Sequence, residues 1–353
     1  MSGSRIQEDS GLVHPWTEPP APGRAITVAP GIRWIRMPLP FALDHINLWL
    51  LEDDGGWAIV DTGIGLADTP ELWERVFEAE LDGKPVTRVI VTHFHPDHMG
   101  NAGWLVERWG VDLWCTQAEW LTAQLAWRQR NGADVEKRLM HYRRHGCDES
   151  VIDAFRQRGN HYPHLVPTLT PDFRCLRNGD VVTVRGRRWE ILTVHGHAPE
   201  HACLWCPEAG VLISGDQVLP KITTNVSVWA DQPFANPLRL YLDSLTRFRP
   251  MPADTLALPS HGLPFRGLHP RLDRLRQHHD ARLAATVDAI AEPRTGAELI
   301  PVLFKRALDV HQLGFAIGEV VAHLHWLEAE GAVTRSTDGD GVYRFRRASP
   351  VSR

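Results

Sequence analysis

The chain has 353 residues, a hydrophobic fraction of 43% and a formal net charge of −5 at pH 7. These values are typical of a folded protein of about two domains, so they exclude disorder throughout the chain and a global basic field for nucleic acid or anionic membranes. Five cysteines do not make a disulfide scaffold and fit a reducing compartment. Because no targeting segment or membrane-length apolar run is visible, we expect a cytoplasmic protein.

The N-terminal half predicts an α/β arrangement. Residues 1–24 are polar and rich in proline and serine, which indicates a loose arm. An amphipathic helix is predicted at residues 71–81, and strands are predicted at residues 26–28, 32–37, 46–51, 57–60 and 86–91. In such architectures, polar residues at the carboxyl ends of strands form the active site.

The middle of the chain predicts a helical insertion between two strand-rich halves. Apolar residues recur at helical spacing from Gln117 to about Arg158. Strands return at residues 181–184, 189–194, 202–205, 210–213 and 255–258. We therefore expect one catalytic domain at residues 25–279, interrupted by helices at about 117–158.

The C-terminal region, residues 280–353, predicts three helices and a hairpin, an order that resembles a winged helix. Helices are expected at residues 281–291, after the capping box of Thr295 and Glu298, and at residues 318–330. The Asp338-Gly339-Asp340-Gly341 run predicts the hairpin turn. The third helix carries no lysine or arginine. A packing or dimerisation module is therefore favoured over a DNA-binding one.

The 19 histidines include a dense cluster at His93-Phe94-His95-Pro96-Asp97-His98, directly after a predicted buried strand. In an extended chain, His93 and His95 share one face because the side-chain period of a strand is two. Asp97 and His98 lie beyond Pro96, where the chain must turn, so they can approach from another direction. Imidazole and carboxylate groups at this spacing predict a metal site rather than a solvated surface cluster.

Three later strand ends offer further donors, at His197, Asp216 and His261. Seven donors satisfy two metal ions with Asp216 as the bridge: His93, His95, Asp97, His98, His197, Asp216 and His261. Two metals about 4 Å apart activate one bridging water and bind a substrate oxygen.

These motifs resemble the metallo-β-lactamase-fold hydrolase superfamily. The family signature Thr-His-x-His-x-Asp-His-x-Gly stands at Thr92–Gly100. Supporting motifs stand in the family's order at Asp61-Thr62-Gly63, Gly196-His197 to His201, Ser214-Gly215-Asp216 and His261-Gly262. The resemblance covers about residues 26–274 and implies an α/β fold, an αββα sandwich with the metals at one edge of two packed sheets.

The resemblance also implies the role of each donor. The first metal is held by His93, His95 and His197, the second by Asp97, His98 and His261, and Asp216 bridges them. Asp61 is expected to support the ligands through hydrogen bonds. The all-histidine first set resembles glyoxalase II-like members. The chain departs from the family pattern at His195, where proline is frequent, and at Glu200, where glycine is frequent; we interpret His195 as structural.

The function expected from these residues is that of a binuclear metal-dependent hydrolase. A bridging hydroxide attacks a carbonyl or phosphorus centre, and Asp97 helps to orient it. The leading substrate is a small-molecule thioester or other carboxylic ester, because the acidic chain has no track for RNA. Zinc is the expected metal, and iron or manganese also suit these ligands.

Two other functions stay open. The winged-helix-like tail resembles that of a hydrolase branch which includes a mitochondrial endoribonuclease, so an endoribonuclease or phosphodiesterase is the first alternative. A metal-containing DNA-binding regulator is the second. Nucleic acid and membrane partners are not expected, and a homodimer through the tail is compatible with its balanced charge.

Two aromatic residues of the insertion allow a further hypothesis. Trp120 and Trp127, with Leu121, either line an apolar cleft beneath a lid over the metals or pack inside the insertion. The Cys203-Leu204-Trp205-Cys206 string lacks a second pair at zinc-ribbon spacing, so both thiols are expected in the core.

Overall fold

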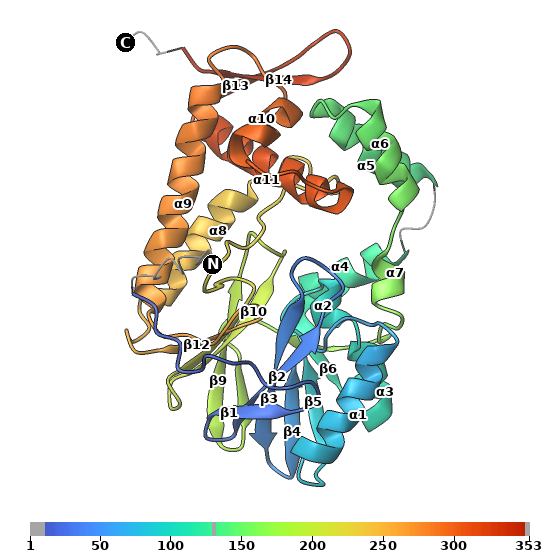
Figure 1. The fold of residues 1–353 in the computed structure, drawn as a ribbon, viewed down its shortest axis with the longest axis vertical. Helices are drawn as coiled ribbons and strands as arrows, with labels where there is room; N and C mark the ends of the chain where they lie inside the picture. Colours follow the sequence, from blue (N-terminus) through green and yellow to red (C-terminus); the bar gives the residue numbers. More distant parts are fainter. Residues whose placement is uncertain (1–10, 129–131, 350–353) are drawn as a thin grey trace, which may run out of the picture.

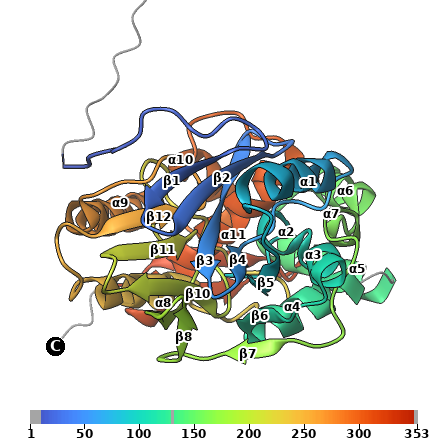
Figure 2. The same cartoon turned by 90° about the horizontal axis from the view of Figure 1, so that it is seen from below.

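The computed structural model describes residues 11–128 and 132–349. Two β-sheets pack face to face, and helices cover the outer side of each (Figure 1, Figure 2). This arrangement is the predicted αββα sandwich, so the fold class is confirmed.

The first sheet has seven strands that follow one another in sequence order. They are β1 (Ala25–Ala29), β2 (Ile32–Pro38), β3 (His45–Asp53), β4 (Gly56–Val60), β5 (Val86–Ile90), β6 (Leu113–Thr116) and β7 (Arg174–Leu176). Pairing is antiparallel from β1 to β4 and parallel from β4 to β7. The sequence analysis missed β6 and β7, because strands of four and three residues are too short to show an alternating pattern.

The second sheet has five strands in the order β12, β11, β10, β9, β8. Their bounds are β8 (Val181–Val184), β9 (Arg187–Val194), β10 (His201–Cys206), β11 (Val211–Gly215) and β12 (Leu256–Pro259). Only the β11–β12 pair of this sheet is parallel. Large side chains from both sheets fill the space between them, including Trp34, Trp49 and Trp189, which are at most 1% exposed.

Amphipathic helices bury the outer face of each sheet. On the first sheet lie α1 (Asp68–Glu80), α2 (Pro96–Met99) and α3 (Ala102–Trp109), and Trp73 of α1 belongs to the same buried cluster as Leu48 of β3. On the second sheet lies α8 (Pro237–Leu245), followed by the short 3₁₀ turn Thr246–Phe248, and Tyr241 of α8 packs in one cluster with Leu212 of β11. These layers leave the carboxyl ends of β5, β9, β11 and β12 as the positions for the site.

The predicted helices of the insertion are present, and they are followed by one additional short helix. It comprises α4 (Gln117–Arg128), α5 (Gly132–Arg144), α6 (Glu149–Arg158) and α7 (Tyr162–Leu165). Its members pack in two places: Ala123 of α4 and Tyr162 of α7 join the core beside the first sheet, whereas Leu139 of α5 and Phe155 of α6 join the core of the C-terminal helices. In Figure 1, α5 and α6 accordingly lie beside α10 and α11.

The C-terminal region has the predicted order of three helices and a hairpin. The elements are α9 (Leu268–Ala289), α10 (Gly296–Leu303), α11 (Val310–Ala329), β13 (Val333–Thr337) and β14 (Tyr343–Arg347). The capping box is confirmed, since Thr295 and Glu298 each accept a hydrogen bond from the backbone N–H of the other. No helix in the described ranges is both long enough and apolar enough to cross a membrane.

Two of these helices begin earlier than predicted. The first, α9, starts at Leu268 rather than at residue 281, so the predicted domain border at residue 280 falls inside one continuous helix. Pro270 is compatible with this earlier start, because it lies in the first turn, where a missing N–H costs no helical hydrogen bond. The third, α11, starts at Val310 rather than at residue 318, because tertiary packing holds Gly314 and Gly318 inside the helix.

Candidate metal centre

The strand ends bring all seven predicted donors together. His93 to His98 follow β5, His197 follows β9, Asp216 follows β11 and His261 follows β12. The ligand atoms form three overlapping groups, each of whose atoms lie within 4.8 Å of one another. The groups are His93 with His95 and His197, His93 with His98 and Asp216, and Asp97 with His98 and His261.

The first group consists of three imidazoles whose ring nitrogens converge. His93 Nε2 lies 2.8 Å from His95 Nδ1 and 3.2 Å from His197 Nε2, and the remaining pair is 3.1 Å apart. Two nitrogens bound to one tetrahedral zinc ion lie roughly 3.3 Å apart, given zinc–nitrogen bonds of about 2.0 to 2.1 Å. The spacing of this group therefore fits one metal ion.

The group of Asp97, His98 and His261, called the second group from here on, contains two imidazoles and a carboxylate. His261 Nε2 lies 3.4 Å from Asp97 Oδ2, and His98 Nε2 lies 3.7 Å from the same oxygen. Asp216 stands between the two groups, since its Oδ2 is 3.3 Å from His197 Nε2 and its Oδ1 is 3.5 Å from His98 Nε2. The two oxygens of one carboxylate thus face different groups.

Hydrogen bonds on the far side of three imidazoles decide which nitrogen faces the centre. The Nδ1 atoms of His98, His197 and His261 lie 2.8, 2.8 and 2.7 Å from Asp61 Oδ2, the Asn225 carbonyl oxygen and the His45 carbonyl oxygen. These oxygens only accept hydrogen bonds, so each Nδ1 carries a hydrogen and each Nε2 is the nitrogen that faces the centre. A metal ion would take the place of any proton on these Nε2 atoms, and the orientation of the three rings therefore fits metal ligation.

Asp61 is the predicted support of this arrangement, and the structure places it there. It follows β4 with a positive φ of 61°, and its side chain is fully buried. Asp61 Oδ1 accepts the Thr92 backbone N–H at 2.8 Å, while Oδ2 faces His98. The carboxylate thereby holds both ends of the His93–His98 segment.

The charges of the two groups differ. Burial and the neighbouring imidazoles hold the pKa of His93 well below its usual value and lower that of His95 to about 3, so both rings are neutral. Burial disfavours the cationic form of His261 as well, but Asp216 and Asp97 outweigh it and raise its pKa to about 10. Asp97 is ionised, since His98 and His261 overcome the effect of burial and lower its pKa to about 2. Without metal, the second group thus pairs an ionised carboxylate with a cationic imidazole, whereas the imidazoles of the first group are neutral.

Two supporting residues were missed by the sequence analysis. Glu119, at the start of α4, is fully buried and accepts the backbone N–H groups of Phe94 at 2.9 Å and Glu200 at 2.6 Å. His201, also fully buried, stacks on the His93 ring and accepts the Asp216 backbone N–H at 3.2 Å. No local pattern marks Glu119, whereas His201 lies in the His195–His201 motif and its position at the start of β10 was a usable signal.

The other residues singled out in the sequence have structural contacts. His195 Nδ1 lies 2.7 Å from the Pro199 carbonyl oxygen, which fits its structural interpretation. Cys203 and Cys206 are buried, as expected. Trp120 stacks on Phe173, and Trp127 donates to the Val166 carbonyl oxygen at 3.0 Å, so both rings pack against residues that follow the predicted insertion.

Comparison with known proteins agrees with this geometry. The model of the metallo-beta-lactamase superfamily matches residues 42–261, which is more than half of the chain. A model described as the C-terminal domain of metallo-beta-lactamase-like proteins matches residues 283–348.

Individual relatives match most of this chain. A crystal structure of a beta-lactamase domain protein from Burkholderia ambifaria is 48% identical, with a TM-score of 0.90 over 96% of this chain and 99% of that chain. A probable metallo-hydrolase of Bacillus subtilis is 24% identical over 88% of this chain and 96% of its own length. A hydroxyacylglutathione hydrolase of Erythrobacter litoralis is 24% identical over 73% of this chain and 82% of its own length. Fold, donor set and family models agree, and the chain belongs to the metallo-beta-lactamase superfamily as a metal-dependent hydrolase.

Proposed function

We propose that the chain is a binuclear hydrolase of thioesters or other carboxylic esters, with two zinc ions as its cofactor. The observation that carries the binuclear centre is Asp216, whose two oxygens face two different groups of donors. His93, His95 and His197 would hold one ion, Asp97, His98 and His261 the other, and Asp216 both. Iron or manganese suit the same ligands.

When bound, the ions supply an activated water nucleophile and stabilise the negative charge that develops on the substrate oxygen. The protein holds its donors in place through Asp61, Asn225 and His45. Asp97 orients the attacking water by accepting a hydrogen bond from it. Its low pKa suits this role, because an ionised carboxylate stays an acceptor across the neutral range.

An aromatic rim supports an apolar acyl group as part of the substrate. The rim consists of Phe41, His311, Phe315 and Trp229, whose successive ring centroids lie 5.5, 4.9 and 5.7 Å apart. Phe41 precedes His45 by four residues, and Trp229 follows Asn225 by four, so the rim joins the two segments that support His261 and His197. All four rings are partly exposed and offer surface to a hydrocarbon chain.

The relatives and the charge of the chain support the same substrate class. The Erythrobacter relative is named as a hydrolase of hydroxyacylglutathione, in which an acyl group is joined to glutathione. α11, the third helix of the C-terminal region, carries Glu319 and Glu328 and no lysine or arginine, which does not favour RNA or DNA. A small-molecule substrate, a cytoplasmic location and a homodimer through the C-terminal region remain parts of this proposal.

Metal content and a substrate panel test the proposal. Protein purified without chelator should contain close to two metal equivalents, and chelation should abolish hydrolysis. Thioesters should be hydrolysed faster than lactones, phosphodiesters or RNA. Full activity at one equivalent would contradict the binuclear centre, and preferential cleavage of RNA would replace the ester by the endoribonuclease alternative.

A further inference from the structure

The segment of residues 219–228 connects the metal centre with the C-terminal helices. It follows Asp216 in the chain and supplies both polar neighbours of His197 Nδ1: the Asn225 carbonyl oxygen at 2.8 Å and Thr224 Oγ1 at 2.9 Å. The position of this carbonyl determines which nitrogen of His197 carries hydrogen and where its ring points. Any group that fixes the segment therefore also fixes His197.

α11 holds the end of the segment closely. The Val228 backbone N–H donates to the Gly318 carbonyl oxygen at 3.1 Å. The Ser227 hydroxyl lies 2.7 Å from Asn225 Oδ1 and 3.3 Å from the Phe315 carbonyl oxygen, so its single hydrogen is directed to the nearer acceptor, Asn225. A Cβ atom on Gly318 would stand 2.7 Å from the Ser227 side chain, so only glycine permits this approach.

A buried ion pair adds a second connection from the C-terminal helices. Glu319 Oε2 lies 3.5 Å from Asn225 Nδ2, and its Oε1 lies 3.2 Å from Arg282 of α9. Glu319 is 7% exposed. A carboxylate this deeply buried needs its partners, so Asn225 is held by more than a surface contact.

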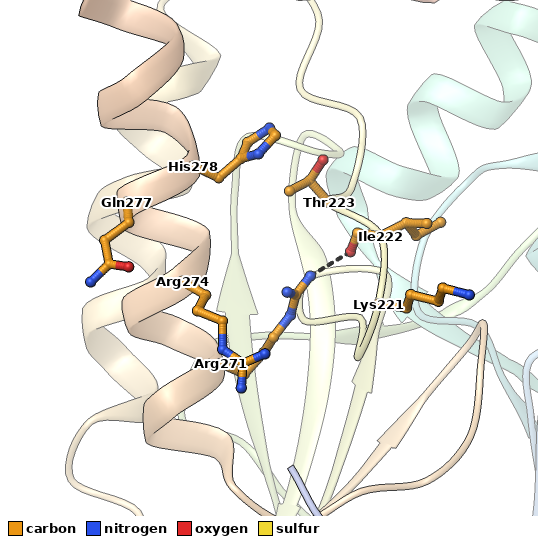
Figure 3. A pocket seen from close by; sticks show the side chains of 7 residues that line it. All are labelled: Lys221, Ile222, Thr223, Arg271, Arg274, Gln277 and His278. Carbon is orange, nitrogen blue, oxygen red and sulfur yellow. Dashed lines mark hydrogen bonds between the residues drawn. The ribbon is translucent and has the colours of Figure 1, made fainter. Parts of the chain in front are cut away.

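α9 holds the beginning of the segment. Arg271 is 6% exposed, and it donates through Nε to the Leu219 carbonyl oxygen and through Nη2 to the Ile222 carbonyl oxygen, both at 2.6 Å. Figure 3 shows this guanidinium reaching from α9 to Ile222, across a cavity of about 590 Å³ between the helix and residues 221–223. Because the cavity leaves one side of the segment unpacked, its position depends on these directed contacts.

We propose that the C-terminal helices position His197 through residues 219–228, and that Gly318, Ser227 and Arg271 are positioning residues for the metal centre. The inference rests on the proposed metal site. It gives the C-terminal region a part in metal binding, which acts through the position of His197 and is additional to its own packing.

Gly318→Ala tests the proposal, with Gly314→Ala as the matched control. Both glycines lie in α11, but a Cβ on Gly314 meets only Phe155, at 3.9 Å. Titration with Co²⁺ against a competing chelator should show one of the two binding steps of Gly318→Ala weakened by about tenfold to a hundredfold, the range for changes that act on a ligand through its neighbours. The Co²⁺ absorption spectrum of that step should change, and the Gly314→Ala variant should match the wild type.

Ser227→Ala provides a milder variant in case Gly318→Ala does not fold. It removes only the hydroxyl, and should weaken the same step by about fivefold, the effect of one neutral hydrogen bond. If Gly318→Ala lowers stability but keeps wild-type Co²⁺ affinity and spectrum, the contact is only structural and the inference is wrong. If the wild type itself binds no Co²⁺, the proposed metal site fails instead, so the two failures are distinguishable.

Discussion

The two sheets supply their candidate ligands in different ways. The first sheet contributes His93, His95, Asp97 and His98 within six residues after β5, held at both ends by Asp61. The second sheet contributes His197, Asp216 and His261 from three strand ends. Each of these three depends on a different neighbour, namely Asn225, His201 and His45.

We call the four donors of the first sheet the local half of the centre, or first half. The three donors of the second sheet are the assembled half, or second half. The first half has its four donors in one short segment that Asp61 holds at both ends, and Glu119 and His201 contact the same segment. The second half requires that loops more than a hundred residues apart come together, for example His261 with His45. Substitutions far from the centre should therefore disturb the second half more readily than the first.

Asp216→Asn should have the largest effect, because the two oxygens of Asp216 face both groups of donors. An amide cannot neutralise two cations as a carboxylate does, so one metal equivalent should be lost and turnover should fall by at least about a hundredfold. Elemental analysis and kinetics measure both results. Asp243→Asn, on the exposed side of α8, is the control and should behave as the wild type. Normal metal content in Asp216→Asn would mean that the two donor groups bind metal without a shared carboxylate.

Asp61→Asn disturbs the donors of the first half, and it should weaken metal affinity by about tenfold to a hundredfold. Asparagine tolerates the positive φ at this position, so the backbone should be preserved. Its amide nitrogen must then face either the Thr92 N–H or His98 Nδ1, and the latter would reverse the tautomer that presents Nε2 to the centre.

The control for Asp61→Asn is Asp53→Asn, another buried carboxylate of the first sheet. Asp53 bonds Thr87 and Arg88 and belongs to none of the donor groups. It should cost stability without changing metal affinity in chelator competition. Equal losses of affinity in both variants would show that general destabilisation, and not the Asp61–His98 contact, controls binding.

The local half is also the half that the sequence predicts best. The order of donors from His93 to His98 needs only the strand period and the turn at Pro96, and the structure brings them together as expected. His197, Asp216 and His261 were found because each follows an apolar strand. The supporting role of Glu119 was not predicted, because its partners Phe94 and Glu200 are distant in sequence. Local sequence patterns do not indicate contacts between distant residues.

Tertiary packing also explains the errors in the fold. α9 and α11 start before the predicted residues because the buried clusters around them stabilise turns that contain Pro270 or Gly314. Asn225 and Thr224, which orient His197, lie in an irregular segment. Such a segment has no periodic pattern from which these contacts could be predicted. Helix order, the capping box and the sandwich were predictable because they depend on local pattern.

Glu119→Gln should have a smaller effect on turnover and a characteristic effect on stability. Glu119 links the halves by accepting N–H groups from Phe94 and Glu200, and glutamine keeps one of the two acceptors. Loss of the other should cost about 1 to 3 kcal/mol in the free energy of unfolding. Turnover should fall less than in the two aspartate variants, because Glu119 touches backbone groups and not a donor atom.

The pH dependence of that stability tests whether the carboxyl group of Glu119 titrates as its environment predicts. Burial raises the pKa of Glu119 to about 7, above its value in the unfolded chain. Between a pH of about 4.3 and about 7, Glu119 therefore holds a proton in the folded metal-free protein that it lacks in the unfolded chain, and the contribution of this residue to stability falls as the pH rises through this window. The difference between wild type and Glu119→Gln in denaturant unfolding should fall there by about 1.4 kcal/mol for each unit between the two pKa values. A flat difference would indicate that Glu119 stays ionised.

The smallest effect on turnover is expected for the other side chains of α4, which continues from Glu119 over the first sheet. Trp120 stacks on Phe173 at a centroid distance of 4.8 Å, whereas Leu121 is 50% exposed. Trp120→Ala should therefore destabilise the protein by about 3 kcal/mol and Leu121→Ala by less than about 0.5 kcal/mol. Neither should change the ratio of kcat/KM between long-chain and short-chain thioesters, because a ring that packs against Phe173 does not select the substrate. A selective loss with long chains would bring back the lid hypothesis, and would mean that the insertion joins the assembled half of the centre when substrate binds.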